Sequence, residues 1–277
     1  MDIRRVLILG DSLSIQFGIS FLSLLGFPPR GGRTSFRGIL KPFTVPCTNV
    51  TLQNETEEPI SFNIDLLIYR RSPIADFEYL NEESSSNGTL ANFQRTFVQS
   101  NPKRTVIIAN AGAWMKKMGD YTFVFHSILN WIDSFPNATT KILAFYRPTI
   151  PGHFNCKPNA PNISKPTEFD WTEPVLQSPY NDYNEYLRDT QMMLSSGELI
   201  EKYNWLDFES YNRYSREFIE NRTADRPTIY WLNIFNSSVL RRDGHVGFRD
   251  CLHYYHPGPT DWWVHFLYSM LLDIAKS

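Results

Sequence analysis

The two ends of the chain carry residues that could perform nucleophilic catalysis. Ser12 closes the motif Gly-Asp-Ser at residues 10–12, and Asp250 stands three residues before His253. A serine hydroxyl becomes a useful nucleophile when a histidine takes its proton and a carboxylate holds that histidine in one tautomer. In a tight Asp-x-x-His turn the carboxylate can reach Nδ1 and leave Nε2 for the serine. We therefore predict a catalytic triad of Ser12, Asp250 and His253.

Each of these motifs also has a plainer explanation. Asp11 or Ser12 could simply cap a helix, as such residues often do. His253 could be a loop histidine with an acid nearby, and His256 is an alternative base. The acid three residues upstream favours His253. We expect His245 to order a turn or line an acceptor cleft, and we predict no metal site because no set of His, Cys and carboxylate residues has metal-ligand spacing.

A third group of residues could stabilise a developing oxyanion. The apolar run 105–109 leads directly into Asn110, with Gly112 two residues later. The backbone N–H of a serine at a helix start can hold negative charge, and an Asn amide at a strand end is a reasonable second donor. The ordinary alternative is a turn residue. If Asn110 is a donor, Asn110→Ala should lower kcat with little change in stability.

These residues need a scaffold that brings both ends of the chain together. Continuous apolar runs predict buried strands, and apolar segments of helical length separate them, which favours an α/β fold with three layers and a central parallel sheet. The expected strands are 6–10, 64–69, 105–109, 141–146 and 229–235. The expected helices are 13–25, 90–99, 120–134, 180–203 and 261–274. We expect one domain, 1–277, with 28–60 and 151–180 as functional loops beside the site.

The composition limits the kinds of partner that the protein is expected to bind and the cellular compartment in which it is expected to reside. The net charge of −2 gives no reason to expect nucleic acid, and the sequence holds no run long enough to cross a membrane. The excess of N-x-S/T sequons favours a secretory lumen, with a chance cluster as the alternative. The seven sequons are at Asn49, Asn54, Asn87, Asn137, Asn162, Asn221 and Asn236. The three cysteines, Cys47, Cys156 and Cys251, allow one disulfide at most.

Several motifs in one order resemble a known family. They are Gly-Asp-Ser-Leu with Gln16, Asn-x-Gly-x-Trp from Asn110, Arg242-Asp-Gly-His245, and the long block Asp250-Cys-x-His253-x-x-x-Pro-Gly-x-x-Asp261-x-Trp263. This series is similar to the trichome birefringence-like proteins of the PC-esterase group, a branch of the SGNH/GDSL superfamily. A segment from Tyr146 to Cys156 resembles a further family block, so the resemblance covers nearly the whole chain.

The plant members of that family are Golgi polysaccharide O-acetyltransferases. The resemblance implies that Ser12 accepts an acetyl group, His253 moves the proton and Asp250 orients the histidine. Asn110 and the Ser12 amide would form the oxyanion hole, while the substrate-binding residues would include Gly112, Arg242 and His245. It also implies a disulfide between Cys156 and Cys251.

The same resemblance implies a glycan or polysaccharide acceptor, no bound cofactor, and an acetyl donor such as acetyl-CoA or an acetylated intermediate. It places the protein in the Golgi lumen, with membrane contact only through an N-terminal anchor outside this sequence. The chain has Ser14-Ile15-Gln16 where the plant proteins have Arg-Asn-Gln, and His253-Tyr254-Tyr255 where they have His-Trp-Cys. These departures concern donor and acceptor rather than the triad. The alternatives are an esterase with the same triad and a non-catalytic carbohydrate-binding descendant.

Overall fold

The computed structural model describes most of the segments that the sequence assigns to the core. The described residues are 3–26, 43–47, 60–68, 104–135, 142–153, 188, 205–223, 226–247 and 250–276. Among them, six strands form one sheet in the order β2-β3-β1-β4-β5-β6. Their bounds are Ile3–Gly10 for β1, Phe43–Cys47 for β2, Ile60–Ile68 for β3, Arg104–Ala109 for β4, Ile142–Tyr146 for β5 and Ile229–Trp231 for β6.

The sheet is mostly parallel. β1 pairs with β3 and β4, β4 pairs with β5, and β5 pairs with β6, all in parallel, while β2 runs antiparallel to β3 at the edge. The four consecutive residues Val6 to Leu9 of β1 are all buried, so both faces of the sheet are covered at its centre. These strands confirm the predicted α/β class.

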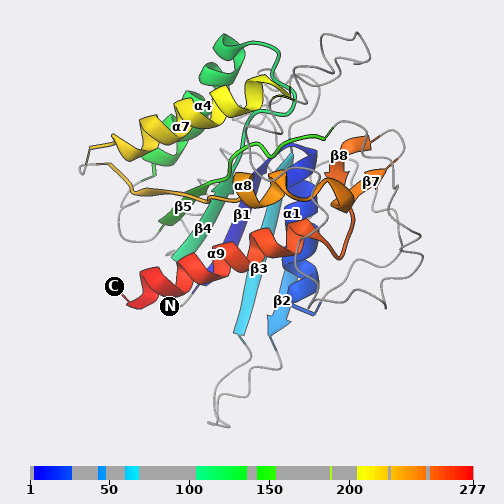
Figure 1. Cartoon of the computed structure of the whole chain (residues 1–277). Coiled ribbons are helices and arrows are strands. Elements are labelled where there is room, and N and C mark those ends of the chain that lie inside the picture. Colours follow the sequence, from blue (N-terminus) through cyan, green and yellow to red (C-terminus); the bar gives the residue numbers. More distant parts are fainter. Residues whose placement is uncertain are drawn as a thin grey trace.

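Helices lie on both faces of this sheet (Figure 1). Their bounds are Ser12–Leu24 for α1, Met118–Asp133 for α4, Asp207–Glu220 for α7, Phe235–Val239 for α8 and Pro259–Lys276 for α9. The chain moves from β1 towards β3 through α1, and in the opposite direction from β4 to β5 through α4. Because such crossovers are right-handed, α1 and α4 fall on opposite faces. α9 packs on α1, and α7 packs on α4.

This topology creates the crevice in which parallel sheets bind ligands. After β1 the chain continues towards β3, and after β4 it continues in the opposite direction towards β5. The carboxyl ends of the neighbouring strands β1 and β4 therefore border a topological switch point. Ser12 follows β1 directly, and Asn110 follows β4 directly. Two of the residues predicted to do chemistry therefore lie beside each other at the same edge of the sheet.

Several elements differ from the sequence-based expectation. The segment 28–60 was expected to be loop, yet it contains β2. The strand expected over 229–235 ends at Trp231, and Phe235 instead begins α8. Helix α7 was not expected at all, although its buried residues recur every three or four positions, as on one face of a helix. The expected helix 90–99 lies outside the described residues, as does 180–203 apart from Arg188.

Two other expectations concern the outside of the protein. Among the described helices, none combines the length and apolar character needed to cross a membrane. Asn221 and Asn236 are exposed, and the other five sequons lie outside the described residues. The single domain over 1–277 and the lumenal location stay predictions.

Candidate active site

The residue before Ser12 caps helix α1 and leaves the serine free. Asp11 is the N-cap, and its Oδ1 accepts a hydrogen bond of 2.9 Å from the backbone N–H of Leu13. The capping role that could have belonged to Ser12 is thus filled by its neighbour. Ser12 is the first residue of α1, where a backbone N–H has no partner within the helix. Its N–H and the positive end of the helix dipole are therefore available to an anion.

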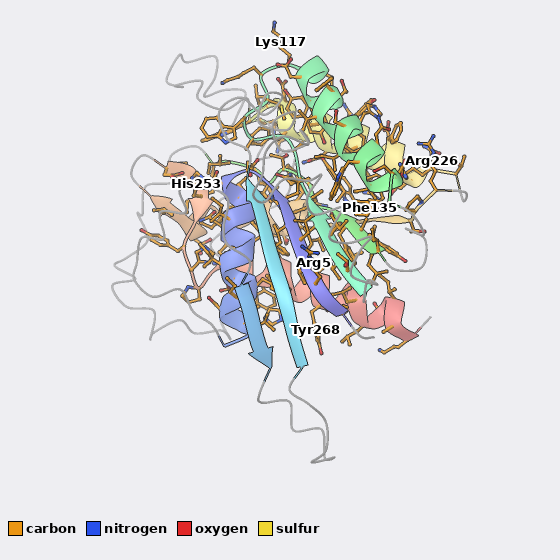
Figure 2. The ribbon with its side chains drawn as sticks, turned by 180° about the vertical axis from the view of Figure 1, so that it is seen from behind. Arg5, Lys117, Phe135, Arg226, His253 and Tyr268 are labelled. Carbon is orange, nitrogen blue, oxygen red and sulfur yellow. The ribbon has the colours of Figure 1, made fainter. Side chains whose placement is uncertain are left out.

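Ser12 meets the predicted base across 241 positions of sequence. Its Oγ lies 2.7 Å from Nε2 of His253, and Nδ1 of His253 lies 2.9 and 2.8 Å from the two carboxylate oxygens of Asp250. The serine hydroxyl can thus donate to Nε2 while the Nδ1–H donates to the carboxylate. This is the hydrogen-bond chain of a serine triad, with the nucleophile, base and orienting acid in the predicted order. Figure 2 shows His253 beside the end of α1 nearest to this edge of the sheet.

The local structure that carries the acid and base differs from the expected tight turn. Asp250 and His253 lie on strand β8, Asp250–Tyr254, which pairs antiparallel with β7, His245–Gly247, with an irregularity in the register. The Asp250 carboxylate reaches back to accept from the backbone N–H groups of Leu252 at 3.3 Å and His253 at 3.1 Å. These hydrogen bonds fold the Asp250 side chain back over the following residues of the strand. The Asp-x-x-His spacing therefore brings the two side chains together even though both residues lie in a strand.

The charge of Asp250 is stabilised by its surroundings. Burial raises the pKa of this carboxyl, but the hydrogen bonds and charge of His253, with the backbone N–H groups, outweigh burial and hold the pKa below its usual range. The side chains of His253 and Asp250 are 20% and 44% exposed. An ionised Asp250 therefore orients the His253 ring throughout the neutral pH range.

The lowered pKa of Asp250 predicts a pH-dependent contribution to stability. A carboxyl whose pKa falls on folding stabilises the protein above its ordinary pKa of 3.8, and this contribution is lost as the pH falls below that value. We expect the gap in unfolding free energy between wild type and Asp250→Asn to be largest above about pH 5 and to shrink through about pH 4. Urea unfolding across this range measures it. A gap that grows on acidification would contradict the assignment.

Asn110 occupies the predicted position but uses its amide differently. Its side chain is fully buried, and Nδ2 donates to the backbone carbonyls of Arg147 at 2.9 Å and Ala111 at 3.2 Å, with Thr149 Oγ1 at 3.3 Å. The amide hydrogens therefore join the carboxyl ends of β4 and β5. Among the described residues, no contact links this amide to Ser12. The burial and hydrogen bonds of this side chain argue against the expectation that Asn110 can be changed at little cost in stability.

Removing the Asn110 amide should now affect folding as well as any catalysis. Asn110→Ala leaves the Arg147 carbonyl without this buried donor, which should cost about 1–3 kcal/mol of unfolding free energy. If the amide also rotates to serve an oxyanion, kcat falls by about 10²–10³ in the protein that remains folded. Chemical unfolding and turnover at low temperature separate the two effects. Wild-type values in both would contradict any role for the amide.

Gly112 is placed by packing rather than by a contact with Ser12. Its φ of 147° lies in the region that favours glycine, and a β-carbon would stand 1.9 Å from Thr149 Oγ1. Any larger residue would push Thr149 away and disturb its hydrogen bond to the Ala111 carbonyl, 2.5 Å. The loop after β4 therefore needs glycine for its shape, which was not apparent from the motif alone.

His245 orders the strand pair behind the triad. It is buried, its Nδ1 lies 3.1 Å from the carbonyl oxygen of His253, and its ring stacks on Tyr254 with centroids 4.2 Å apart. Its Nε2 lies 2.6 Å from Nδ1 of buried His153. Burial, and then the neighbouring His153, lower the pKa of His245 well below its usual value. Of the two roles expected for it, ordering a turn fits this burial and lining an open cleft does not.

The remaining predicted residues are only partly described. Arg242 begins a short 3₁₀ helix, Arg242–Gly244, and its side chain lies outside the described set. Cys251 is in a disulfide. The expected partner, Cys156, lies outside the described residues, so this pairing stays a prediction. No group of three or more metal-binding side chains occurs within the described part of the chain.

His256, the alternative base, contacts a different serine. Its Nδ1 lies 3.0 Å from the hydroxyls of both Ser20 and Thr260, and these two residues are fully buried. Burial lowers the pKa of His256, with Asp261 opposing it in part. Because His253 and not His256 reaches Ser12, the geometry favours the predicted choice between the two.

Arg147 supports the site and was missed from the sequence. It is completely buried behind α1, where Nη2 donates to Ser14 Oγ at 3.0 Å and lies 3.9 Å from Asp11 Oδ1. The guanidinium also lies over the ring of Trp263, 5.7 Å from its centroid. It therefore places a positive charge beside the buried carboxylate that caps the serine helix. The sequence did contain a sign of this role. Arg147 directly follows an apolar strand, which is an unusual position for a residue that normally faces water.

Tyrosine side chains support the loop after β4. The hydroxyl of Tyr146 accepts from the backbone N–H of Ala111 at 3.2 Å and lies 3.0 Å from the hydroxyl of Tyr121. Burial raises the pKa of Tyr146 to about 12, so it remains a neutral hydroxyl. The chain of hydroxyls holds the segment that contains Asn110 and Gly112.

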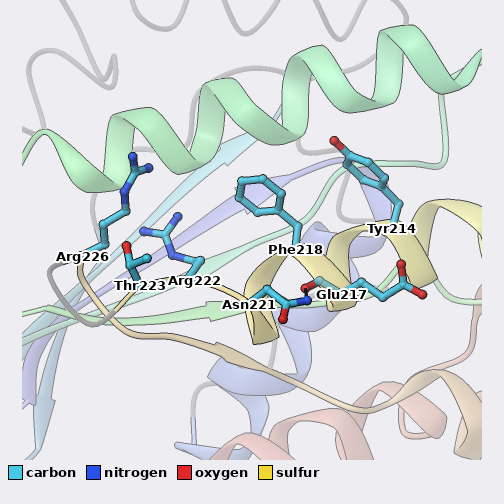
Figure 3. A pocket seen from close by; sticks show the side chains of 7 residues that line it. All are labelled: Tyr214, Glu217, Phe218, Asn221, Arg222, Thr223 and Arg226. Atoms are coloured by element: carbon cyan, nitrogen blue, oxygen red, sulfur yellow. Dashed lines mark hydrogen bonds between the residues drawn. The ribbon is translucent and has the colours of Figure 1, made fainter.

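A separate cavity of about 470 Å³ lies beside α4 and α7 (Figure 3). Its lining residues are Tyr214, Glu217, Phe218, Asn221, Arg222, Thr223 and Arg226. Asp133 of α4 binds both arginines from this lining. Because α4 and α7 lie on the face opposite α1, we assign this cavity no part in the chemistry of Ser12.

Comparisons with known proteins leave the geometry as the basis for any assignment. A scan against protein-family models, a search of curated proteins and a search of solved structures each found no match. The resemblance to the PC-esterase group thus stays an expectation carried by the motifs.

Proposed function

We propose that this protein is a serine-dependent acyltransferase that O-acetylates a glycan through an acetyl-Ser12 intermediate. The observation that carries the proposal is the chain of contacts from Ser12 Oγ to His253 Nε2, 2.7 Å, and from His253 Nδ1 to Asp250, 2.8 Å. Four further parts of the proposal rest on the family resemblance. They are the acetyl group as the group transferred, the sugar as its acceptor, an SGNH-type fold and a Golgi location. The α/β sheet with its switch point is consistent with that fold.

The proposed reaction has two halves that use the same three residues. Ser12 Oγ attacks the acetyl carbonyl while its proton passes to His253 Nε2, and the imidazolium is stabilised by Asp250. The oxyanion faces the Ser12 N–H and the positive end of α1. His253 then gives the proton to the leaving group, which departs and leaves acetyl-Ser12. A sugar hydroxyl next loses its proton to His253 and attacks the acetyl carbon. The bond from that carbon to Ser12 Oγ then breaks, and His253 returns the proton to Oγ, which regenerates the serine.

Hydrolysis is the second candidate, and one observation favours it. The Asp250 side chain is 44% exposed and that of His253 is 20% exposed, so water has access to this side of the triad. A transferase must exclude water, or it must position a sugar hydroxyl so that the hydroxyl attacks the acetyl group faster than water does. The same acetyl-Ser12 would then release acetate, which makes an esterase of the SGNH type.

One experiment separates these candidates. The purified protein is incubated with 4-nitrophenyl acetate, with and without xylan- or pectin-derived oligosaccharides, and the products are quantified by mass spectrometry. Acetylated sugar supports transfer, acetate alone supports hydrolysis, and rapid quenching should capture an acetyl group on the peptide containing Ser12. Turnover that is equal in wild type and Ser12→Ala would refute both. Sugar binding without any turnover would support the non-catalytic alternative.

A further inference from the structure

Helix α1 presents two side chains to strand β8. Ser12 and Gln16 are four residues apart, so they lie on one face of the helix, one turn from each other. Their partners, His253 and Tyr254, are neighbours on β8. The contact between nucleophile and base is thus followed immediately by a second contact between the same two elements, which Figure 1 shows side by side.

The second contact is a pair of hydrogen bonds made by one side-chain amide. Gln16 Nε2 donates to the carbonyl of Tyr254 at 2.6 Å, and the N–H of Tyr254 donates to Gln16 Oε1 at 3.1 Å. A primary amide carries a donor and an acceptor side by side, and a carboxylate or an apolar side chain of similar length does not. Gln16 therefore satisfies both backbone groups of Tyr254, as an adjacent strand would.

The other sides of β8 are held by different elements. The ring of Tyr254 is buried, stacked on His245 and edge-on to Trp263 with centroids 5.5 Å apart. The carbonyl of Cys251 accepts from the N–H of His153 at 2.9 Å. These contacts fix β8 against β7 and the core. In addition to the Ser12–His253 contact itself, the Gln16 amide links β8 directly to the serine helix.

We propose that Gln16 is a positioning residue, which sets the register of β8 against α1 and so keeps His253 Nε2 at Ser12 Oγ. This role rests on the proposed acyl-transfer function. Gln16 acts through the backbone of Tyr254, and it takes no part in bond making or proton transfer. Since the base and Tyr254 are consecutive, a shift of the Tyr254 backbone moves His253 by a similar amount.

The expected effect follows from the sensitivity of acyl transfer to geometry. A misplacement of about 1 Å can cost about 10²-fold in rate. Gln16→Met keeps the length of the side chain and loses both hydrogen bonds, while Gln16→Glu keeps the acceptor and loses the donor. We expect each to lower kcat by about 10–100-fold, with KM for the acetyl ester little changed, because the positioned atoms react rather than bind the ester.

The matched control is His256→Ala. His256, in the segment after β8, also contacts α1 through Ser20, which is two turns along the helix from Ser12, and it contacts Thr260 of α9. A general loosening of the helix would therefore lower turnover in this variant as well. A positioning role for Gln16 predicts that His256→Ala keeps kcat near the wild-type value while the Gln16 variants do not.

The test measures kcat and KM with 4-nitrophenyl acetate, together with hydrogen exchange of the Tyr254 amide, in wild type and the three variants. A lower kcat in both Gln16 variants, with faster exchange of the Tyr254 amide in Gln16→Met, which has lost the acceptor, and neither change in His256→Ala, supports the proposal. A Gln16→Met protein with kcat within about twofold of wild type, or a His256→Ala protein that loses as much, overturns it. If wild type and Ser12→Ala turn over equally, the acyl-transfer function itself fails. The positioning role then falls with it, and the exchange data still report whether the amide contact exists.

Discussion

Ser12→Ala and His253→Ala should each abolish nearly all acyl turnover, with kcat lowered by about 10⁴–10⁶-fold. In the proposed reaction the Ser12 hydroxyl is the attacking group, and the imidazole of His253, 2.7 Å from it, is the base that contacts it among the described residues. Asp250→Ala should cost about 10⁴-fold, because the ring would lose the partner that fixes its tautomer. The measurement is the initial rate with an acetyl ester, at a temperature where far-ultraviolet circular dichroism shows each variant folded.

The losses should also be strongly non-additive. The three side chains act as one unit, so the triple variant should be about as inactive as Ser12→Ala alone. His256→Ala is the control, because its ring contacts Ser20 and Thr260 instead of the nucleophile. If His256→Ala were inactive and His253→Ala active, the base would have been assigned to the wrong histidine.

Arg147→Met should destabilise the fold by about 3–5 kcal/mol, because it leaves the buried carboxylate of Asp11 without its cationic partner. Both side chains are completely buried, and the guanidinium also donates to Ser14 Oγ and to the Pro148 carbonyl. Asp11 Oδ1 caps α1 while Oδ2 has no hydrogen-bond partner, so this carboxylate depends on the nearby positive charge. Urea unfolding at neutral pH measures the loss.

A double variant tests the electrostatic explanation. Asp11→Asn keeps an oxygen that can cap Leu13 and removes the charge, so Asp11→Asn combined with Arg147→Met should recover part of the stability that Arg147→Met loses alone. The exposed pair of Arg216 and Glu220, 2.7 Å apart, provides a control. Arg216→Met should cost at most about 0.5 kcal/mol, because solvent screens this pair. Equal losses for both arginines would show that burial of the Arg147–Asp11 pair has no special importance.

The sequence by itself determined the elements whose signal is local. The run from Val6 to Gly10 predicts a fully buried strand, and the structure has β1 there with Ser12 at the first position of α1. The Asp-x-x-His spacing predicted a carboxylate against Nδ1, and the distance is 2.8 Å. These predictions succeed because strand burial, helix starts and short side-chain pairs depend on residues close together in the chain.

Local signals were weaker where an element is short or mixed. β2 has five residues, including Pro46, and lies at the sheet edge, so its pattern was lost inside the long segment 28–60. β8 was expected to be a turn, because the spacing of Asp250 and His253 is satisfied equally by a turn or by an irregular strand. The identity of a strand here depends on β7, which supplies the hydrogen bonds that define it.

Tertiary structure alone decided which distant groups share a buried environment. Arg147 can balance Asp11, and Asn110 can join the ends of β4 and β5, only because β1, β4 and β5 are neighbours in the sheet. Gln16 meets Tyr254 across 238 positions for the same kind of reason. A residue sequence states which groups are available for hydrogen bonds. The order of the strands and the packing of the helices determine which of these groups are buried next to one another. A buried polar group then forms hydrogen bonds with the donors or acceptors within its reach.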